Sequence, residues 1–187
     1  HLGGAIDGDG GEKGGRFLQL CDAFGLPVVS LCDTPGFMVG PESEKTAAVR
    51  RGSRLIVASA NLTVPLFTII VRKGYGLGGQ AMAGGSFHQP FFTIAWPTGE
   101  MGPMGLEGAV VLGFRKELEA AVDDKARNTL YEKLVANMYE KGKAVSVASV
   151  FEIDAVIDPA ETRSWLLRGK RTAGTRRGKP RRYIDVW

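Results

Sequence analysis

The feature that most constrains the fold is an unbroken apolar segment at residues 64–71 that leads directly into a cluster of glycines. A strand with one face in water alternates polar and apolar residues, whereas a strand covered on both faces is apolar throughout. This segment is of the second kind, and its apolar positions are Val64, Leu66, Phe67, Ile69, Ile70 and Val71. It therefore predicts a buried strand of a parallel sheet in a layered α/β domain.

The glycines after this strand stand at positions 74, 76, 78 and 79, and the small residues at 80–83 are expected to begin a helix. A strand that runs through a glycine-rich turn into a helix directs free backbone N–H groups toward one point. Such groups can stabilise an oxyanion without a charged side chain. The spacing matches neither common nucleotide-binding loop, so a phosphate site is not favoured. A tight turn that only packs is the alternative.

The rest of the chain predicts strands that alternate with helices, the pattern of an α/β domain. Phe17, Leu20, Cys21 and Phe24 recur at helical spacing and are expected to form the buried face of the first helix. Asp123 is the expected N-cap of a long helix. The expected helices span residues 12–24, 42–62, 106–118, 124–142 and 158–167, and the further strands span residues 27–32 and 91–96.

Three loops follow the three expected strands. They are Asp33–Gly40, Lys73–Gly79 and Trp96–Gly105, and each is rich in glycine, proline or both. The carboxyl ends of parallel strands lie at the same edge of a sheet, where α/β proteins form their ligand sites. We therefore expect these three loops to converge on one site.

Histidine and cysteine are too scarce for several kinds of site. The chain has two histidines, His1 and His88, so a zinc site or a Ser-His-Asp triad is nearly excluded and no metal is expected. Cys21 and Cys32 lie in apolar segments, which predicts two buried, reduced thiols in the cytoplasm, or in the mitochondrial matrix of a eukaryote. No apolar stretch is long enough to predict a membrane span.

Two acidic patterns imitate known motifs. The segment 33–36 resembles the D-x-x-G of GTPases, but no phosphate-binding loop precedes it, so that function is strongly disfavoured. Asp7, Asp9 and Glu12 resemble half of a calcium loop, but the closing glutamate is missing and a solvated turn is preferred. The chain begins with His1 instead of methionine, which favours a fragment of a longer polypeptide.

The net charge of +4 is unevenly distributed. Residues 168–187 contain eight Lys or Arg and one Asp, a charge of +7, so the remainder of the chain carries −3. We expect a domain at residues 1–168 and a basic, extended tail at residues 169–187. The tail could contact an acidic neighbouring subunit or cofactor phosphates. Nucleic-acid binding through residues 171–182 ranks below both, because no RNA-binding motif accompanies the basic residues.

Four segments together resemble a known family, the carboxyltransferase subunits of biotin-dependent acyl-CoA carboxylases, of the propionyl-CoA carboxylase β type. The resemblance is carried by residues 3–40, by VRKGYGLGGQAM at 71–82, by IAWPTGEMGPMGLEGAV at 94–110, and by residues 132–166. They occur in the family's order and match its C-terminal half. The resemblance implies a crotonase-like fold, a superhelix of β-β-α repeats.

This resemblance also implies an activity, in which carboxybiotin on a carrier domain donates CO₂ to the α-carbon of a short- or medium-chain acyl-CoA. Backbone amides at Leu77 and Gly78 would then stabilise the oxyanion of biotin, although the family usually has glycine at position 77. No basic side chain is needed, because biotin itself can take the α-proton. The residues expected to flank biotin or substrate are Pro35, Gly36, Phe37, Gly76, Gly79 and Gln80.

The partners that the resemblance implies are a biotin carboxyl carrier, a biotin carboxylase and an N-terminal carboxyltransferase half, in a homo- or hetero-oligomer. A biotin-dependent decarboxylase or transcarboxylase would run the same half-reaction in another direction. A catalytically silent half that serves only assembly is a further alternative.

Overall fold

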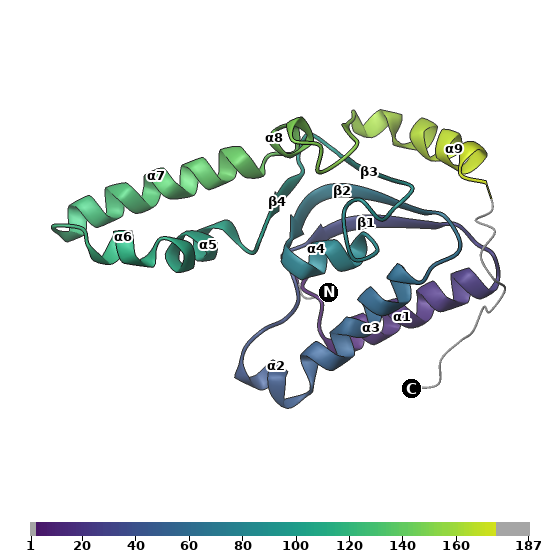
Figure 1. Cartoon of the computed structure of the whole chain (residues 1–187), viewed down its shortest axis with the longest axis horizontal. Coiled ribbons are helices and arrows are strands. Elements are labelled where there is room, and N and C mark those ends of the chain that lie inside the picture. Colours follow the sequence, from purple (N-terminus) through teal and green to yellow (C-terminus); the bar gives the residue numbers. More distant parts are fainter. Residues whose placement is uncertain (1–2, 175–187) are drawn as a thin grey trace.

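The computed structural model describes residues 3–174 as a parallel sheet with helices packed on it and a helical arm that projects from one end (Figure 1). The strands are β1 (Val28–Thr34), β2 (Leu66–Tyr75), β3 (Phe92–Ala95), β4 (Glu100–Gly102) and β5 (Ala155–Val156). The helices are α1 (Gly8–Ala23), α2 (Pro41–Lys45), α3 (Ala48–Ala60), α4 (Gly76–Met82), α5 (Leu106–Gly113), α6 (Arg115–Glu119), α7 (Asp124–Gly142), α8 (Ala144–Ser149) and α9 (Thr162–Thr172), with a 3₁₀ turn at Pro159–Glu161.

The sheet has the order β1-β2-β3-β5, and β4 pairs with the end of β2. All four of these pairings are parallel, and the register places Ile70 of β2 between Cys32 of β1 and Ala95 of β3. Ile69 and Ile70 are completely buried. The prediction of a central strand covered on both faces is therefore confirmed. This strand continues to Tyr75, so Gly74 lies in the strand and not in a turn.

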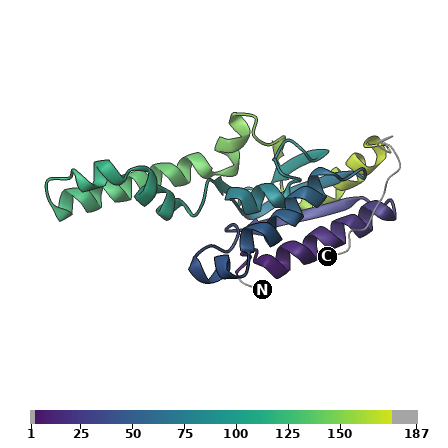
Figure 2. The same cartoon turned by 60° about the horizontal axis from the view of Figure 1, so that its bottom comes forward.

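Helices α1 and α3 run side by side below the sheet (Figures 1 and 2). Their backbones approach closely because both contact faces carry glycine: a Cβ placed on Gly11 would lie 2.8 Å from the Cα of Gly52. Arg51 of α3 fastens the pair with two hydrogen bonds to the Glu12 carboxylate, at 3.0 and 2.8 Å, and with an ion pair to Asp9. The hydrogen bonds from Arg51 lower the pKa of Glu12.

Two expectations about the first helix are wrong. The acidic segment expected to be a solvated turn is the start of α1, where the Asp7 side chain caps the helix by accepting from the Gly10 amide at 2.7 Å. Of the expected apolar face only Cys21 is buried, whereas Leu20 is 37%, Phe17 59% and Phe24 74% exposed. Glycine contacts with α3 set the rotation of the helix, and the buried positions are Gly8, Gly11, Gly15, Leu18 and Cys21.

The strand expected at residues 27–32 is buried on one face only. In β1, Val29 and Leu31 are exposed while the residues between them are buried. One face of this edge strand therefore lacks the covering that β2 has on both faces.

Several expected helices are interrupted or longer than predicted. The helix expected at 42–62 is broken into α2 and α3 by Ala47, whose φ is +57°. The one expected at 106–118 divides into α5 and α6 at Phe114. The last helix runs to Thr172, so the expected extended tail does not begin at residue 169, and Gly169 packs on Phe67 and Phe92. The rest of that tail, residues 175–187, lies outside the described residues.

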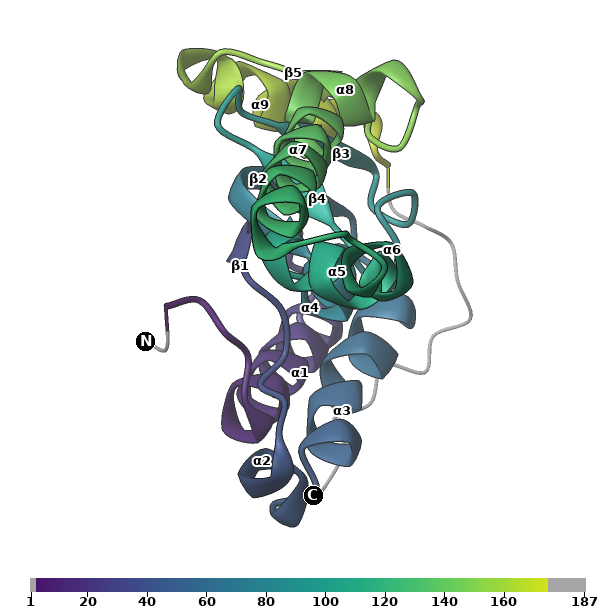
Figure 3. The same cartoon turned by 90° about the vertical axis from the view of Figure 1, so that its left-hand side faces the viewer.

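Helices α5, α6 and α7 form the projecting arm, which Figure 3 shows end-on. Asp123 caps α7 by accepting from the Ala126 amide at 2.7 Å, as predicted. Tyr139 of α7 donates to Glu107 of α5 at 2.6 Å and so ties the two helices together. Over residues 3–174, none of the helices combines the length and the apolar character that crossing a membrane requires.

The α1–α3 contact gives a stability prediction. Gly11→Ala should lower the free energy of unfolding by about 1–3 kcal/mol, because the added methyl group meets backbone that cannot rotate away. Gly108→Ala is the matched control: its Cβ would lie 3.8 Å from Met104 Sδ, so it should be neutral or stabilising by up to about 1 kcal/mol. Denaturant unfolding of both variants measures the difference, and equal effects would contradict the close contact.

The two cysteines give a prediction about reactivity. Both are free and buried, as expected, and burial raises the pKa of Cys32 to about 12 and also raises that of Cys21. The reactive thiolate of Cys32 is therefore roughly a thousandfold scarcer at pH 8 than for an ordinary thiol. Iodoacetamide at pH 8 should leave both cysteines unmodified in the native protein and should label both after denaturation, as measured by mass spectrometry.

Candidate functional site

The three predicted loops converge at the carboxyl ends of the strands. A Cβ placed on Gly78 would lie 2.7 Å from the Cα of Gly36, in the loop after β1. A Cβ placed on Gly76 would lie 2.7 Å from the carbonyl oxygen of Pro103, in the loop after β3. The loop after β3 reaches this point because β4, which lies within it, pairs with the last residues of β2.

The expected glycine turn between β2 and the next helix is replaced by the helix itself. Tyr75 ends the strand and is the N-cap of α4, so that Gly76, Gly78 and Gly79 belong to the first turn. Gly76 makes the sharp change of direction with a φ of +56°, which favours glycine. This first turn leaves the amides of Gly76, Leu77 and Gly78 without an acceptor inside the helix. Within residues 3–174, neither Leu77 nor Gly78 donates to a turn, loop or cap bond.

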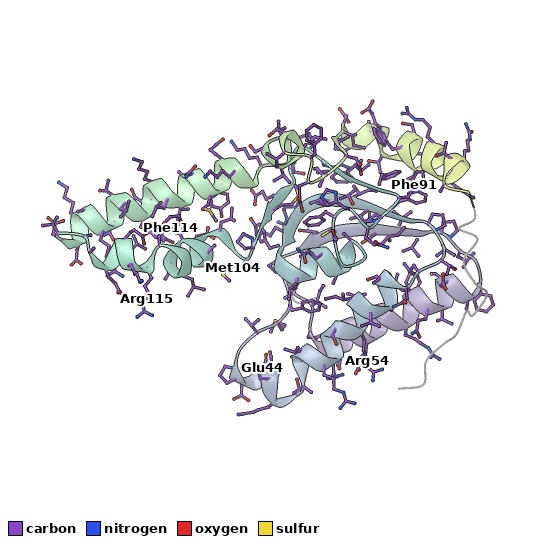
Figure 4. All side chains as sticks on the ribbon, in the orientation of Figure 1. Glu44, Arg54, Phe91, Met104, Phe114 and Arg115 are labelled. Atoms are coloured by element: carbon purple, nitrogen blue, oxygen red, sulfur yellow. The ribbon has the colours of Figure 1, made fainter. Side chains whose placement is uncertain are left out.

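Two of these residues, Gly76 and Leu77, line an open groove of about 520 Å³. One wall is the first turn of α4, and the opposite wall is the segment of β4 and the residues after it. Apolar side chains from the region of α8 complete the lining. The lining residues are Gly76, Leu77, Gln80, Phe87, Met101, Gly102, Pro103, Val147, Val150 and Glu152. Met104, which follows this wall, lies where the arm joins the body (Figure 4).

Some of the predicted site residues line the groove, and others pack beneath it against neighbouring backbone. Gly76, Leu77 and Gln80 line the groove, and the Leu77 side chain is 64% exposed. Gly78 and Gly79 are buried, Gly78 against the loop after β1 and Gly79 against the backbone of Gly74. These two glycines let α4 lie directly on its neighbours.

The loop of Pro35, Gly36 and Phe37 packs against α4 at Gly78. Thr34 Oγ1 accepts from the Gly36 amide at 3.1 Å, and the Ile6 amide donates to the Gly36 carbonyl at 3.0 Å. Pro35 is exposed, and the ring of Phe37 packs on Gly52 of α3 and is not among the groove residues. The contact of these three residues with biotin stays a prediction.

Two polar pairs lie near the site, and no sequence motif predicted either of them. The buried Tyr75 donates its hydroxyl to Glu100 Oε2 at 2.9 Å. Arg72 binds both oxygens of Asp33, at 3.2 and 3.1 Å, and links the ends of β1 and β2. Partial burial would raise the pKa of Asp33, but hydrogen bonds from Arg72 and from the Lys73 amide lower it overall.

The charged groups at the groove are few. Among the described residues, no cluster of three or more His, Cys, Asp or Glu side chains could hold a metal ion. His88 lies 3.5 Å from Glu152, which lines the groove, and both side chains are largely exposed. What the arrangement offers a ligand is an apolar surface with backbone N–H donors at one end, which suits a developing negative charge.

Comparison with known proteins gives consistent matches. A family model, the carboxyl transferase domain, matches residues 1–182. The chain is 37% identical over 175 residues to the propionyl-CoA carboxylase carboxyltransferase subunit of Haloferax mediterranei, which covers 93% of this chain and 33% of that relative. The chain thus spans about a third of the length of this curated relative.

Solved structures agree. A single-chain, multi-domain long-chain acyl-CoA carboxylase superposes with a TM-score of 0.78 and 60% identity, over 90% of this chain and 16% of that one. The transcarboxylase 12S hexamer, with methylmalonyl-CoA bound, superposes with a TM-score of 0.84 and 31% identity, over 94% of this chain and 34% of that one. With the parallel sheet, these similarities confirm the predicted α/β, crotonase-like carboxyltransferase fold.

The contact between Gly78 and Gly36 gives a prediction about stability. Gly78→Ala should lower the free energy of unfolding by about 1–3 kcal/mol, because the new methyl group meets the loop backbone. Leu77→Ala is the matched control one residue away. Its side chain is exposed, so its effect should stay within about 0.5 kcal/mol. Urea unfolding measures both, and an unaffected Gly78→Ala variant would contradict the packing of α4 on this loop.

Proposed function

The chain belongs to the carboxyl transferase domain family, and on that premise we propose that it forms the C-terminal carboxyltransferase half of a biotin-dependent acyl-CoA carboxylase. Such an enzyme transfers CO₂ from carboxybiotin to the α-carbon of an acyl-CoA. The observation that carries the proposal is the first turn of α4, whose amides have no acceptor inside the helix and whose residues Gly76 and Leu77 line an apolar groove. Amide donors of this kind support a reaction that develops negative charge on a carbonyl oxygen.

In the proposed reaction, the Leu77 and Gly78 amides donate to the ureido oxygen of biotin as negative charge grows there. Gly76 and Gln80 line the groove beside them, and Gly79 lets α4 pack on β2. The loop of Pro35, Gly36 and Phe37 supports α4 from behind. Biotin supplies the carboxyl group and takes the α-proton, which fits a groove with few titrating groups.

The proposed partners follow from the same premise. They are an acyl-CoA, a biotin carboxyl carrier, a biotin carboxylase and an N-terminal carboxyltransferase half. One structural relative is a long-chain acyl-CoA carboxylase and another is a hexamer, so the proposal covers acyl-CoA as a class and an oligomeric assembly. The two buried, unpaired thiols support a reducing compartment, such as the cytoplasm.

A biotin-dependent transcarboxylase is the second candidate, favoured by the TM-score of 0.84 with the transcarboxylase 12S structure. The two candidates share the half-reaction at this site and differ in the source of the carboxyl group. Carboxylation that requires ATP and bicarbonate indicates a carboxylase. Carboxylation that requires a second carboxylated acyl-CoA in place of ATP indicates a transcarboxylase.

Replacing one amide tests the proposed site. Leu77→Pro removes the N–H in the first turn, where the helix does not use it, and the position already carries a Cβ. We expect kcat for acyl-CoA carboxylation by the complete assembly to fall about 10²–10³-fold. Carboxylation of free biotin by the biotin carboxylase, measured in parallel, should not change.

Leu77→Ala is the control, because it removes the side chain and keeps the amide. It should retain kcat within about threefold, since an exposed side chain is all that it removes. Gly78→Pro is less diagnostic, because any Cβ at that position meets the backbone of Gly36. A folded Leu77→Pro variant with full activity would show that this amide does not bind the oxyanion.

A further inference from the structure

Tyr75 has a buried phenol at the junction of β2 and α4, and the proposed reaction assigns no chemical role to this side chain. It is 3% exposed, it ends β2, and it is the N-cap of α4, although its side chain makes no capping bond to that helix. Its hydroxyl instead donates to Glu100 Oε2 at 2.9 Å. A buried hydroxyl without a hydrogen-bond partner costs free energy, so the bond to Glu100 offsets the cost of burying Tyr75.

Glu100 lies next to the residues of β4 that line the groove. It begins β4, whose next residues, Met101 and Gly102, line the groove together with the first turn of α4. Beyond them, the Pro103 carbonyl lies so close to Gly76 that a Cβ there would be 2.7 Å from it. The bond from Tyr75 to Glu100 therefore joins the N-cap of α4 to the first residue of β4.

We propose that Tyr75 is a positioning residue, whose hydrogen bond to Glu100 fixes the first turn of α4 against β4 and so sets the orientation of the Leu77 and Gly78 amides. This inference rests on the proposed function. The backbone pairing of Lys73 with Glu100 aligns the strands, but it ends at Tyr75 and Gly102. The side-chain bond adds a second polar link between β4 and Tyr75, where the chain turns into α4.

The surroundings of the phenol favour a permanent donor. Burial, and then the hydrogen bond to Glu100, raise the pKa of Tyr75, so the phenol stays protonated. Glu100, Glu107 and Tyr139 act on it electrostatically in the same direction. The bond should therefore persist across the range in which the enzyme is assayed.

The chain offers a matched control in Tyr139. Its hydroxyl also donates to a glutamate, Glu107, at 2.6 Å, but at an exposed position. That pair joins α5 to α7 within the arm, and neither residue lines the groove. If loss of a tyrosine–glutamate hydrogen bond were harmful in itself, removing the hydroxyl of Tyr139 would lower activity as much as removing that of Tyr75. If Tyr75 positions the amides, only its own hydroxyl should matter.

The experiment compares Tyr75→Phe, Glu100→Ala, Glu100→Gln and Tyr139→Phe in the complete carboxylase assembly. We expect Tyr75→Phe and Glu100→Ala each to lower kcat about tenfold, with KM for acyl-CoA changed less than twofold, because misdirected amides weaken binding of the transition state more than of the substrate. Glu100→Gln keeps an oxygen acceptor and should retain most of kcat. The double variant Tyr75→Phe/Glu100→Ala should be no slower than either single variant.

Several outcomes would overturn the inference. One is an unchanged kcat for Tyr75→Phe, and another is an equal loss for Tyr139→Phe. A third is a rise in KM without a fall in kcat. If Tyr75→Phe lowers the melting temperature so far that the assembly does not form, Glu100→Ala against Glu100→Gln decides, since only the first loses the acceptor. Failure of the proposed function is distinct, because the unsubstituted assembly would then carboxylate no acyl-CoA.

Discussion

The site depends on how closely three stretches of backbone approach one another at the end of β2. Gly78 lies on the loop after β1, Gly79 lies on Gly74 of the strand itself, and Gly76 lies against the Pro103 carbonyl. Each contact leaves no room for a Cβ, so α4 can begin directly at the strand end only with glycine there. Without these contacts the helix would lie farther from the sheet, and its first turn would not line the groove.

Backbone donors explain why the site has so little titrating chemistry. An N–H group in the first turn of a helix carries partial positive charge at every pH, and it needs no reorganisation when negative charge develops nearby. Several polar and charged side chains of the domain have structural partners: Arg72 with Asp33 and Tyr75 with Glu100 near the site, and Arg51 with Glu12 between α1 and α3. They hold strands and helices in place, and the groove itself is lined mainly by apolar groups.

Local patterns predicted elements well where the determining interactions are close in sequence. The continuous apolar run gave β2, and Asp123 gave the start of α7, because burial on both faces and a side-chain cap both leave a mark within a few residues. The inward face of α1 was wrong for the opposite reason. Its rotation is set by contact of Gly11 with Gly52, and a small residue at a close contact gives no hydrophobic signal.

By itself, the sequence determined that the central strand is buried on both faces, that the loops after the three expected strands are rich in glycine, and that the chain has only two histidines and two cysteines. It also carried the resemblance that the family match confirmed. Only the tertiary structure decided that the glycines form the first turn of α4, that Phe37 packs on α3, and that Tyr75 bonds Glu100. These are contacts between residues far apart in the chain, and the register of parallel strands, which no local pattern encodes, brings them together.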